Sequence, residues 1–281
     1  TVSYDGSEGN AKARVSSIAE ETSSITISSY EEGEFFWSGD AIYSWGDITV
    51  KNNAYIYDGG TLSAGGTITG IEGNSGVMLN MPVLIPPSWA LTTDKTSVNL
   101  NRNIILSSSD SGYYGAVSVN NNRTWSIDTT AGDVILIFDS LTAKNNFKIN
   151  IVYGENRLYI YLIESLSYTA TQTPTSNTLL ECKNGVDIVG TDSDGKPLTY
   201  VIAYNDSLQQ YYQTYGSNVI PAESVIQSPL DIVTIKNGQN VEAYFYLPCC
   251  AMTIKNNSSI KGVIYTGEFE GQNNTYIYFH P

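Results

Sequence analysis

The chain has 281 residues, with 14 lysines and arginines against 28 aspartates and glutamates, so its formal net charge is −14. A field of that sign repels phosphate backbones and anionic lipid headgroups, so neither nucleic acids nor charged membrane surfaces are expected partners. The 21 tyrosines against 7 phenylalanines favour half-exposed sheet positions over a helical core. No apolar stretch approaches the length of a membrane span.

Residues 1–33 are predicted to be a stub that contains one short helix. Ala11, Val15 and Ile18 recur at helical spacing between residues 10 and 22. Residues 34–90 form a glycine-punctuated β region, in which three short units between residues 37 and 70 have the pattern of successive β-coils. The proline-rich stretch Met81–Pro87 then predicts a crossover to the main body, because proline disfavours a central strand.

A degenerate repeat is the most informative pattern in the chain. Strand-like stretches end in Lys-Asn-Asn or Lys-Asn-Gly at Ile48–Asn53, Leu141–Asn146, Val233–Gly238 and Met252–Asn257, with a weaker copy at Val117–Asn122. Asparagine tolerates the left-handed backbone of a tight corner, and stacked asparagines can hydrogen-bond to one another. Strand, corner and strand at about 20 residues per unit predict a parallel β-helix, or β-solenoid.

An all-β fold is therefore expected, and a β-sandwich of hairpins is the alternative, because it would use the same Asn-Gly and Asn-Asn turns. The β-solenoid domain is predicted to span residues 91–281, with an irregular insertion at about 165–219 that interrupts the repeat. The insertion contains a second predicted helix. Asn205 or Asp206 caps its start, and Gly216 stops it.

Three cysteines, Cys182, Cys249 and Cys250, are too few and too oddly placed for a disulfide framework or a metal site. The adjacent pair could form a strained vicinal disulfide, or one member could reach Cys182. Alternatively, all three are buried small hydrophobic residues.

The stretch IKGVIYTGEFEGQNNTYIYFHP from Ile260, together with Gly132–Phe138 and Arg157–Leu162, resembles the β-helical C-terminal region of PilX-like minor pilins. Leu247–Ala251 occupies the corner at which the family usually has Ala-Pro. The resemblance covers about Leu91 to Pro281. It implies a structural component of bacterial type IV pili, at or near the pilus tip, that supports assembly and adhesion. The implied partners are other pilins and a receptor or glycan.

The same resemblance implies an extracellular, cell-surface location, with membrane anchoring before assembly only through an N-terminal helix upstream of this chain. Residues 10–22 could be the end of that helix or merely a local helix. Two alternatives are a carbohydrate-active β-helix enzyme, either a polysaccharide lyase or a hydrolase, and a secreted surface adhesin unrelated to pili.

Few residues offer catalytic chemistry. The single histidine, His280, is penultimate and poorly placed for a preorganised site. Carboxylate pairs such as Asp128 with Asp133, or Asp187 with Asp192 and Asp194, have the residue types for glycoside hydrolysis but also those for Asx turns. The start of a calcium loop at Asp192–Gly195 lacks the later glutamate, which favours a tight turn. We therefore expect no enzyme activity, no cofactor and no metal.

Paired aromatic side chains are the remaining candidates for binding, because planar rings stack on sugars and fill pockets on protein partners. On this ground we predict an interaction surface that includes Tyr113, Tyr114, Tyr211 and Tyr212.

Overall fold

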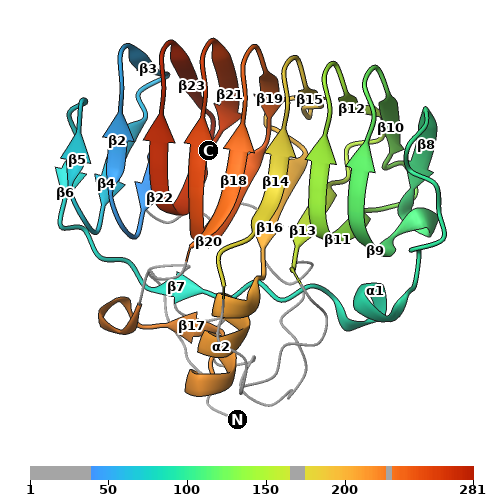
Figure 1. The fold of residues 1–281 in the computed structure, drawn as a ribbon, viewed down its shortest axis with the longest axis horizontal. Helices are drawn as coiled ribbons and strands as arrows, with labels where there is room; N and C mark the ends of the chain where they lie inside the picture. Colours follow the sequence, from blue (N-terminus) through green and yellow to red (C-terminus); the bar gives the residue numbers. More distant parts are fainter. Residues whose placement is uncertain (1–38, 165–174, 226–229) are drawn as a thin grey trace, which may run out of the picture.

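The computed structural model describes residues 39–164, 175–225 and 230–281 (Figure 1). Strands make up 50% of the structure and helices 9%, so the all-β expectation is confirmed. Within the described residues the strands pair in parallel, apart from one short antiparallel pair, β7 (Met81–Pro82) with β17 (Val219–Ile220). A sandwich of hairpins would need antiparallel pairing between consecutive strands, which these strands do not show.

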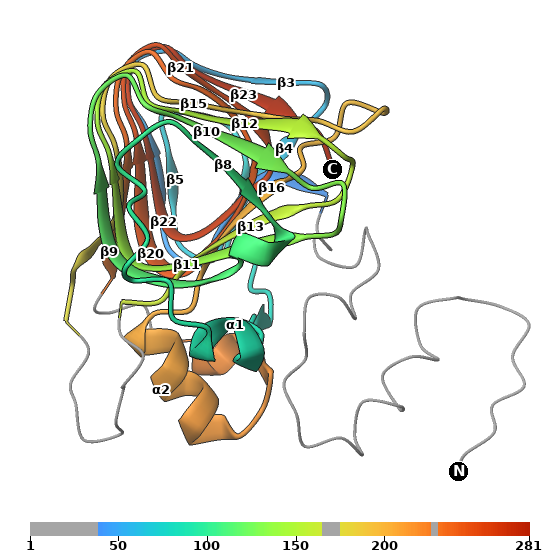
Figure 2. The same cartoon turned by 90° about the vertical axis from the view of Figure 1, so that its right-hand side faces the viewer.

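The strands lie in three rows around a common interior (Figure 2). The upper row is an eight-stranded sheet made of β3 (Ala54–Tyr57), β23 (Thr275–Phe279), β21 (Ser258–Gly262), β19 (Asn240–Glu242), β15 (Asp187–Val189), β12 (Lys148–Tyr153), β10 (Thr124–Asp128) and β8 (Ile104–Ser107). The base row contains β1 (Asp40–Ser44), β4 (Thr61–Ala64), β6 (Asn74–Ser75), β13 (Leu158–Leu162) and β16 (Thr199–Ala203). The side row contains β2 (Ile48–Val50), β5 (Ile68–Thr69), β14 (Thr178–Cys182) and β18 (Asp231–Ile235).

Four long strands bend from the base row into the side row and join the two into one thirteen-stranded sheet: β9 (Gly112–Val119), β11 (Val134–Ala143), β20 (Tyr244–Ile254) and β22 (Ile264–Gly271). The first half of β11 pairs with β13 and its second half pairs with β14. The first half of β20 likewise pairs with β16 and the second half with β18. Because of these bends, six parallel strands pair in a closed ring, in the order β16, β13, β11, β14, β18 and β20, with β20 pairing again with β16.

The chain does not run along the stack from one end to the other. Its first strands lie beside its last: β1 pairs with both β22 and β4, and β3 pairs with β23. After β6 the chain crosses along the base to the opposite end of the stack, where β8 and β9 begin (Figure 1). It then winds back until β22 and β23 meet β1 and β3. Strands on both sides of residue 90 therefore belong to the same sheets, and the expected crossover contains β7.

All copies of the predicted repeat stack in register. The strand pairings of the side row place the first residue of every copy at the same register position. These residues are Val117, Leu141, Val233, Met252 and Ile48. Two further copies that sequence inspection overlooked complete the series, at Leu180–Gly185 and Phe269–Asn274. Both carry glutamate where most other copies have threonine, which hides the similarity. Part of the expected insertion is thus regular, since residues 178–203 supply β14, β15 and β16 to the sheets.

The irregular part of the expected insertion that the structure describes follows this regular stretch, after residue 203. Within it, α2 (Asp206–Tyr215) begins with Asn205, whose side chain accepts a hydrogen bond from the backbone N–H of Leu208, and ends at the left-handed Gly216. The predicted second helix is confirmed. The other helices are α1 (Ser88–Thr92) and two 3-10 turns, at Ser108–Asp110 and Ala222–Ser224. The predicted helix at residues 10–22 lies outside the described residues.

Two apolar clusters flank the base row. The inner cluster fills the space between the three rows with side chains such as Trp125, Phe138 and Phe245. The outer cluster lies beneath the base row, where Tyr43 and Trp45 are covered by the crossover. The Trp45 indole N–H donates to the carbonyl of Leu79 at 3.0 Å. The crossover and α2 therefore cover one outer side of the stack (Figure 2).

The corner geometry makes the first testable prediction. Asn257 has φ of 55°, and the equivalent corner residues Gly185 and Gly238 have φ of 66° and 67°. We expect Asn257→Gly to change the free energy of unfolding by less than about 0.5 kcal/mol and Asn257→Val to lower it by about 1–2 kcal/mol, because a β-branched side chain is strained in the left-handed region. Urea unfolding of both variants checks this. Both variants lose the hydrogen bond from Asn274, so this loss does not distinguish them. Equal stabilities of the two variants would therefore contradict a left-handed backbone at position 257.

Candidate functional site

Each row of strands presents a different outer surface, because in-register stacking aligns equivalent side chains from neighbouring strands. The base row is covered by the crossover and α2. Outside the base row, two places carry aligned polar or aromatic side chains: the corner where the side row meets the upper row, and the outer side of the upper row next to β3.

The corner carries a row of lysines beside a row of asparagines, here called the lysine–asparagine edge. The lysine row consists of Lys144, Lys183, Lys236, Lys255 and Lys51, with Asn120 and Gln272 at the two remaining positions. The backbone N–H of each lysine donates to the carbonyl of a residue on the neighbouring strand at 2.7–3.0 Å. The strand ladder thus continues into the corner. It holds Lys144, Lys183, Lys236 and Lys255 on successive strands, and Gln272 separates Lys255 from Lys51.

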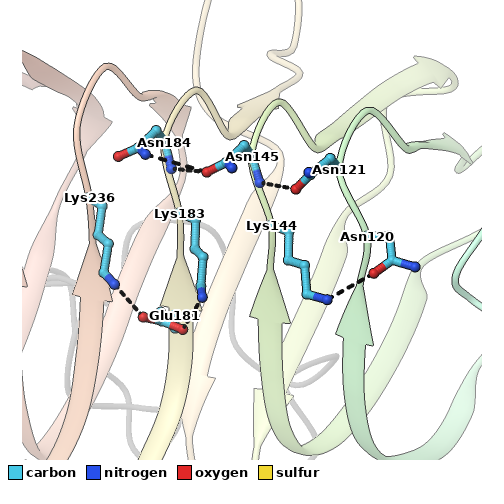
Figure 3. A network of polar contacts seen from close by, with 8 residues as sticks. All are labelled: Asn120, Asn121, Lys144, Asn145, Glu181, Lys183, Asn184 and Lys236. Carbon is cyan, nitrogen blue, oxygen red and sulfur yellow. Dashed lines mark hydrogen bonds and ion pairs between the residues drawn. The ribbon is translucent and has the colours of Figure 1, made fainter.

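The asparagine row lies one residue further along the chain. It consists of Asn121, Asn145, Asn184, Asn237, Asn256, Asn273 and Asn52. Each of the last four donates through its side-chain amide to the side-chain oxygen of its predecessor, at 2.8–3.0 Å. Figure 3 shows the first part of the series together with the neighbouring lysines. Stacked amides of this kind supply a donor and an acceptor at every step.

Two carboxylates partly balance the lysine row, and both come from the repeat copies that sequence inspection overlooked. Glu181 lies 3.6 Å from the Lys183 ammonium and 2.5 Å from that of Lys236 (Figure 3). Glu270 lies 2.7 Å from the Lys51 ammonium. Hydrogen bonds from the lysines, chiefly that of Lys236 for Glu181 and that of Lys51 for Glu270, hold the pKa of both carboxyls below the usual range.

Four tyrosines form the aromatic surface, here called the tyrosine quartet: Tyr55 and Tyr57 on β3, and Tyr276 and Tyr278 on β23. The two strands pair so that Tyr55 is opposite Tyr276 and Tyr57 is opposite Tyr278. Between each pair, Ile56 and Ile277 point to the interior. The alternation Tyr-Ile-Tyr in both strands therefore places all four phenol rings on the outer side.

The rings of the quartet are nearly parallel. Tyr55 and Tyr276 have centroids 5.5 Å apart with planes at 10°, and Tyr57 and Tyr278 have centroids 5.0 Å apart with planes at 15°. Tyr55, Tyr57 and Tyr278 are 43%, 39% and 38% exposed. Since β3 is the last strand of the upper sheet, no described strand lies beyond Tyr55 and Tyr57.

Polar side chains continue the upper surface beside the quartet. Ser259 is opposite Tyr276 and Lys261 is opposite Tyr278 on the next strand, β21. One strand further, Asn240 and Glu242 occupy the same two positions on β19. Desolvation and the neighbouring phenols raise the pKa of Tyr57, so its hydroxyl stays neutral near pH 7. Flat aromatic rings next to hydrogen-bonding groups form a surface that suits a ring-shaped ligand with polar edges.

The tyrosines predicted from sequence do not form an exposed surface. Tyr114 is 4% exposed and Tyr211 is 8% exposed, while Tyr212 packs against the outer cluster. The Tyr113 hydroxyl donates to Asp139, at 2.9 and 2.8 Å from its two oxygens, and burial together with this carboxylate raises the pKa of Tyr113 to about 12. Tyr113 and Tyr114 are neighbours on β9, so their side chains point to opposite sides of the strand. Tyr211 and Tyr212 lie on α2, which packs against the base row through the outer cluster.

All three cysteines are buried free thiols. Burial raises the pKa of Cys182 to about 12, and it also raises the pKa values of Cys249 and Cys250. Neutral buried thiols are poor nucleophiles and metal ligands.

Four of the five carboxylates considered for catalysis accept hydrogen bonds from the backbone or form an ion pair. Asp128 accepts from the backbone N–H of Thr130, and Asp133 accepts from that of Arg157. Asp187 lies 3.1 Å from the Lys148 ammonium. Asp192 accepts from the backbone N–H groups of Asp194 and Lys196, as a tight turn requires.

A cluster of three carboxyls lies where α2 meets the sheets. Glu164 follows β13, Asp206 begins α2, and Asp231 begins β18. Asp231 is 2% exposed and accepts hydrogen bonds from the backbone N–H of Asn177 and the side-chain amide of Asn205. Burial, with a smaller contribution from neighbouring carboxylates, raises the pKa of Asp231 to about 6 and that of Glu164 to about 7.

No protein-family model, characterised protein or solved structure matches this chain. In the part of the chain that the structure describes, no helix is both long and apolar enough to cross a membrane. Within the same residues, no three metal-ligating side chains lie close enough together to hold an ion.

The carboxyl cluster predicts a pH-dependent stability. Because the folded-state pKa values of Glu164 and Asp231 are raised, the folded protein binds more protons than the unfolded chain between about pH 4 and 7. Their stabilising contribution is complete below the unfolded pKa values and is lost as the pH rises through about 6–7. We expect a higher free energy of unfolding at about pH 5 than at about pH 8, measured by urea unfolding.

Glu164→Gln should reduce this difference by about 1 kcal/mol, after allowance for the partial exposure of Glu164. Glu223→Gln, which changes a glutamate in the short helix after β17, serves as the control. An unchanged pH dependence in Glu164→Gln would show that the cluster does not govern it.

Proposed function

We propose that this chain is a parallel β-solenoid that acts as a non-catalytic surface protein and binds saccharide rings on the tyrosine quartet. The observation that carries the proposal is the exposure of near-parallel phenol rings on two adjacent strands of a rigid sheet. The three rows wound around one core support the solenoid description, since each turn of chain contributes a strand to each row.

A sugar ring has an apolar face of C–H groups and a rim of hydroxyls. Stacking on tyrosine rings desolvates the apolar face, and polar groups beside the rings hydrogen-bond to the rim. Ser259 and Lys261 lie next to Tyr276 and Tyr278 in the required positions. The rings sit on sheet strands rather than on a loop, so little conformational entropy is lost when a ligand binds.

Truncation of the quartet tests this proposal. In a glycan-array screen followed by calorimetry on the best glycan, Tyr55→Ala/Tyr278→Ala should weaken binding by at least about fivefold, because each lost ring contact contributes about 0.5–1.5 kcal/mol. The matched control is Tyr153→Ala, which removes a tyrosine that is 62% exposed at the end of β12 in the same sheet.

The control should bind like the unmodified protein, and both variants should keep the unmodified thermal midpoint to within a few degrees. Equal loss in the control, or the absence of any glycan ligand for the unmodified protein, would contradict the proposal.

We also propose that this surface protein is a minor pilin, as the sequence resemblance over Leu91–Pro281 implies. The strands of the resembling stretch run in order from β8 to β23 and make up most of the stack. A tip-located pilin would present its outer surfaces to a receptor or glycan, which agrees with the exposed position of the quartet. The upstream membrane helix that the family carries would lie outside this chain.

Mass spectrometry of the native protein in sheared cell-surface filaments tests the pilin proposal. The expected N-terminal peptide is a processed one that leads a hydrophobic helix, and it should co-purify with the other filament subunits. A conventional signal-peptidase end on protein found only in the culture medium would contradict the pilin assignment. That result would leave saccharide binding by the quartet intact as the property of a secreted adhesin.

A further inference from the structure

The lysine row is an unusual feature in an acidic protein. The net charge of the chain is −14, yet five of its 14 basic side chains stand in one line along a single corner. Neighbouring strands in a sheet are about 4.8 Å apart, so adjacent lysines of the row are held close together. Like charges directly opposite one another destabilise a sheet, and this arrangement therefore calls for compensation.

The carboxylates of the protein neutralise the positive charge of the lysine row only in part. Glu181 is shared by Lys183 and Lys236, and Glu270 pairs with Lys51. The Lys144 ammonium donates to the neutral side-chain oxygen of Asn120 at 2.9 Å. Lys255 also lowers the pKa of Glu270 electrostatically. Among the described residues, the five ammonium groups thus share two carboxylates, which leaves an excess of positive charge along the edge.

Neutral residues fit the same positions, so the corner itself does not require lysine. Asn120 and Gln272 occupy the row in two of the stacked copies. At the end of the stack, the backbone N–H of Asn120 donates to the side-chain oxygen of Asn101 at 2.8 Å. The backbone N–H of Gln272 donates to the carbonyl of Ile254 at 2.8 Å, as the lysines do to their neighbours. The fold therefore does not account for the repeated lysines, and binding of an external anionic ligand would account for them.

We propose that the lysine–asparagine edge binds a linear anionic polysaccharide, such as a polyuronate, laid along the stack. The ammonium row would pair with the carboxylates of the polymer, and the parallel asparagine row would hydrogen-bond to its hydroxyls. Four of the asparagine amides, those of Asn237, Asn256, Asn273 and Asn52, each use one N–H for the preceding asparagine of the row, which leaves the second N–H for a ligand. An extended pyranose chain advances per sugar by a distance close to the strand spacing, so successive sugars meet successive strands.

This geometry favours a polysaccharide over a nucleic acid. A single glycan chain is thin enough to follow one edge, whereas a duplex presents phosphates over a wide surface and would also meet the acidic remainder of the protein. The edge lies on the corner, and the quartet lies on the outer side of the upper row. The inference is therefore independent of saccharide binding by the tyrosines.

Calorimetry with polygalacturonate at low ionic strength tests the inference on the full 281-residue chain. The test variant is Lys144→Gln/Lys255→Gln, because Gln272 already occupies this row and neither lysine is needed to pair Glu181. Binding should weaken at least about fivefold. The control Lys95→Gln/Lys196→Gln makes the same charge change away from the edge and should stay within about twofold.

Two further measurements make the result specific. Glu181→Gln removes a compensating carboxylate and should strengthen polygalacturonate binding about two- to threefold, which a general loss of structure could not do. Tyr55→Ala/Tyr278→Ala should bind polygalacturonate like the unmodified chain, so failure of the quartet and failure of the edge are distinguishable.

Neutral pullulan should not bind at the edge, and duplex DNA at matched charge concentration should bind at least about tenfold more weakly than polygalacturonate. Lack of polygalacturonate binding by the unmodified chain, equal losses in the test and control pairs, or equal affinity for duplex DNA would overturn the inference.

Discussion

The in-register stacking of the lysine–asparagine corners is the constraint on which the rest of the structure depends. A left-handed residue ends the side row in each copy, as Asn146 and Gly185 illustrate, and the backbone N–H of each donates to the carbonyl of the next corner. A shift of one residue would turn every interior side chain outward. The corner therefore decides which side chains fill the core and which line up as rows on the surface.

The crossover gives the stack its second constraint. A solenoid end exposes unpaired strands and apolar side chains, and an uncovered base row would expose a broad aromatic patch. Here β1 covers β22, and the crossover covers Tyr43 and Trp45 beneath the base row. The outer cluster formed in this way buries the outer side of the base row, while the upper row, the side row and the corner between them still face outward.

These two surfaces offer different chemistry on one rigid frame. The quartet presents neutral phenol rings, and the edge presents ammonium groups beside amides, both held by sheet hydrogen bonds. Rows of identical side chains at the strand spacing suit ligands that repeat themselves, which is a property of polysaccharides. Surface recognition of polymers agrees with the buried, protonated state of all three thiols and with the structural partners of the carboxylates.

The sequence by itself was sufficient for the all-β class, the asparagine corners and the α2 caps, because these follow from local backbone preferences that each residue carries. The sequence did not determine which side chains are exposed on the outer surfaces. Tyr-Ile-Tyr occurs at Tyr159–Tyr161 as well as in the quartet, yet Tyr159 is 4% exposed and Tyr57 is 39% exposed. The same alternation lies under the crossover in one row and faces solvent in the other. Only the path of the chain decides between them, because burial depends on segments far apart in sequence.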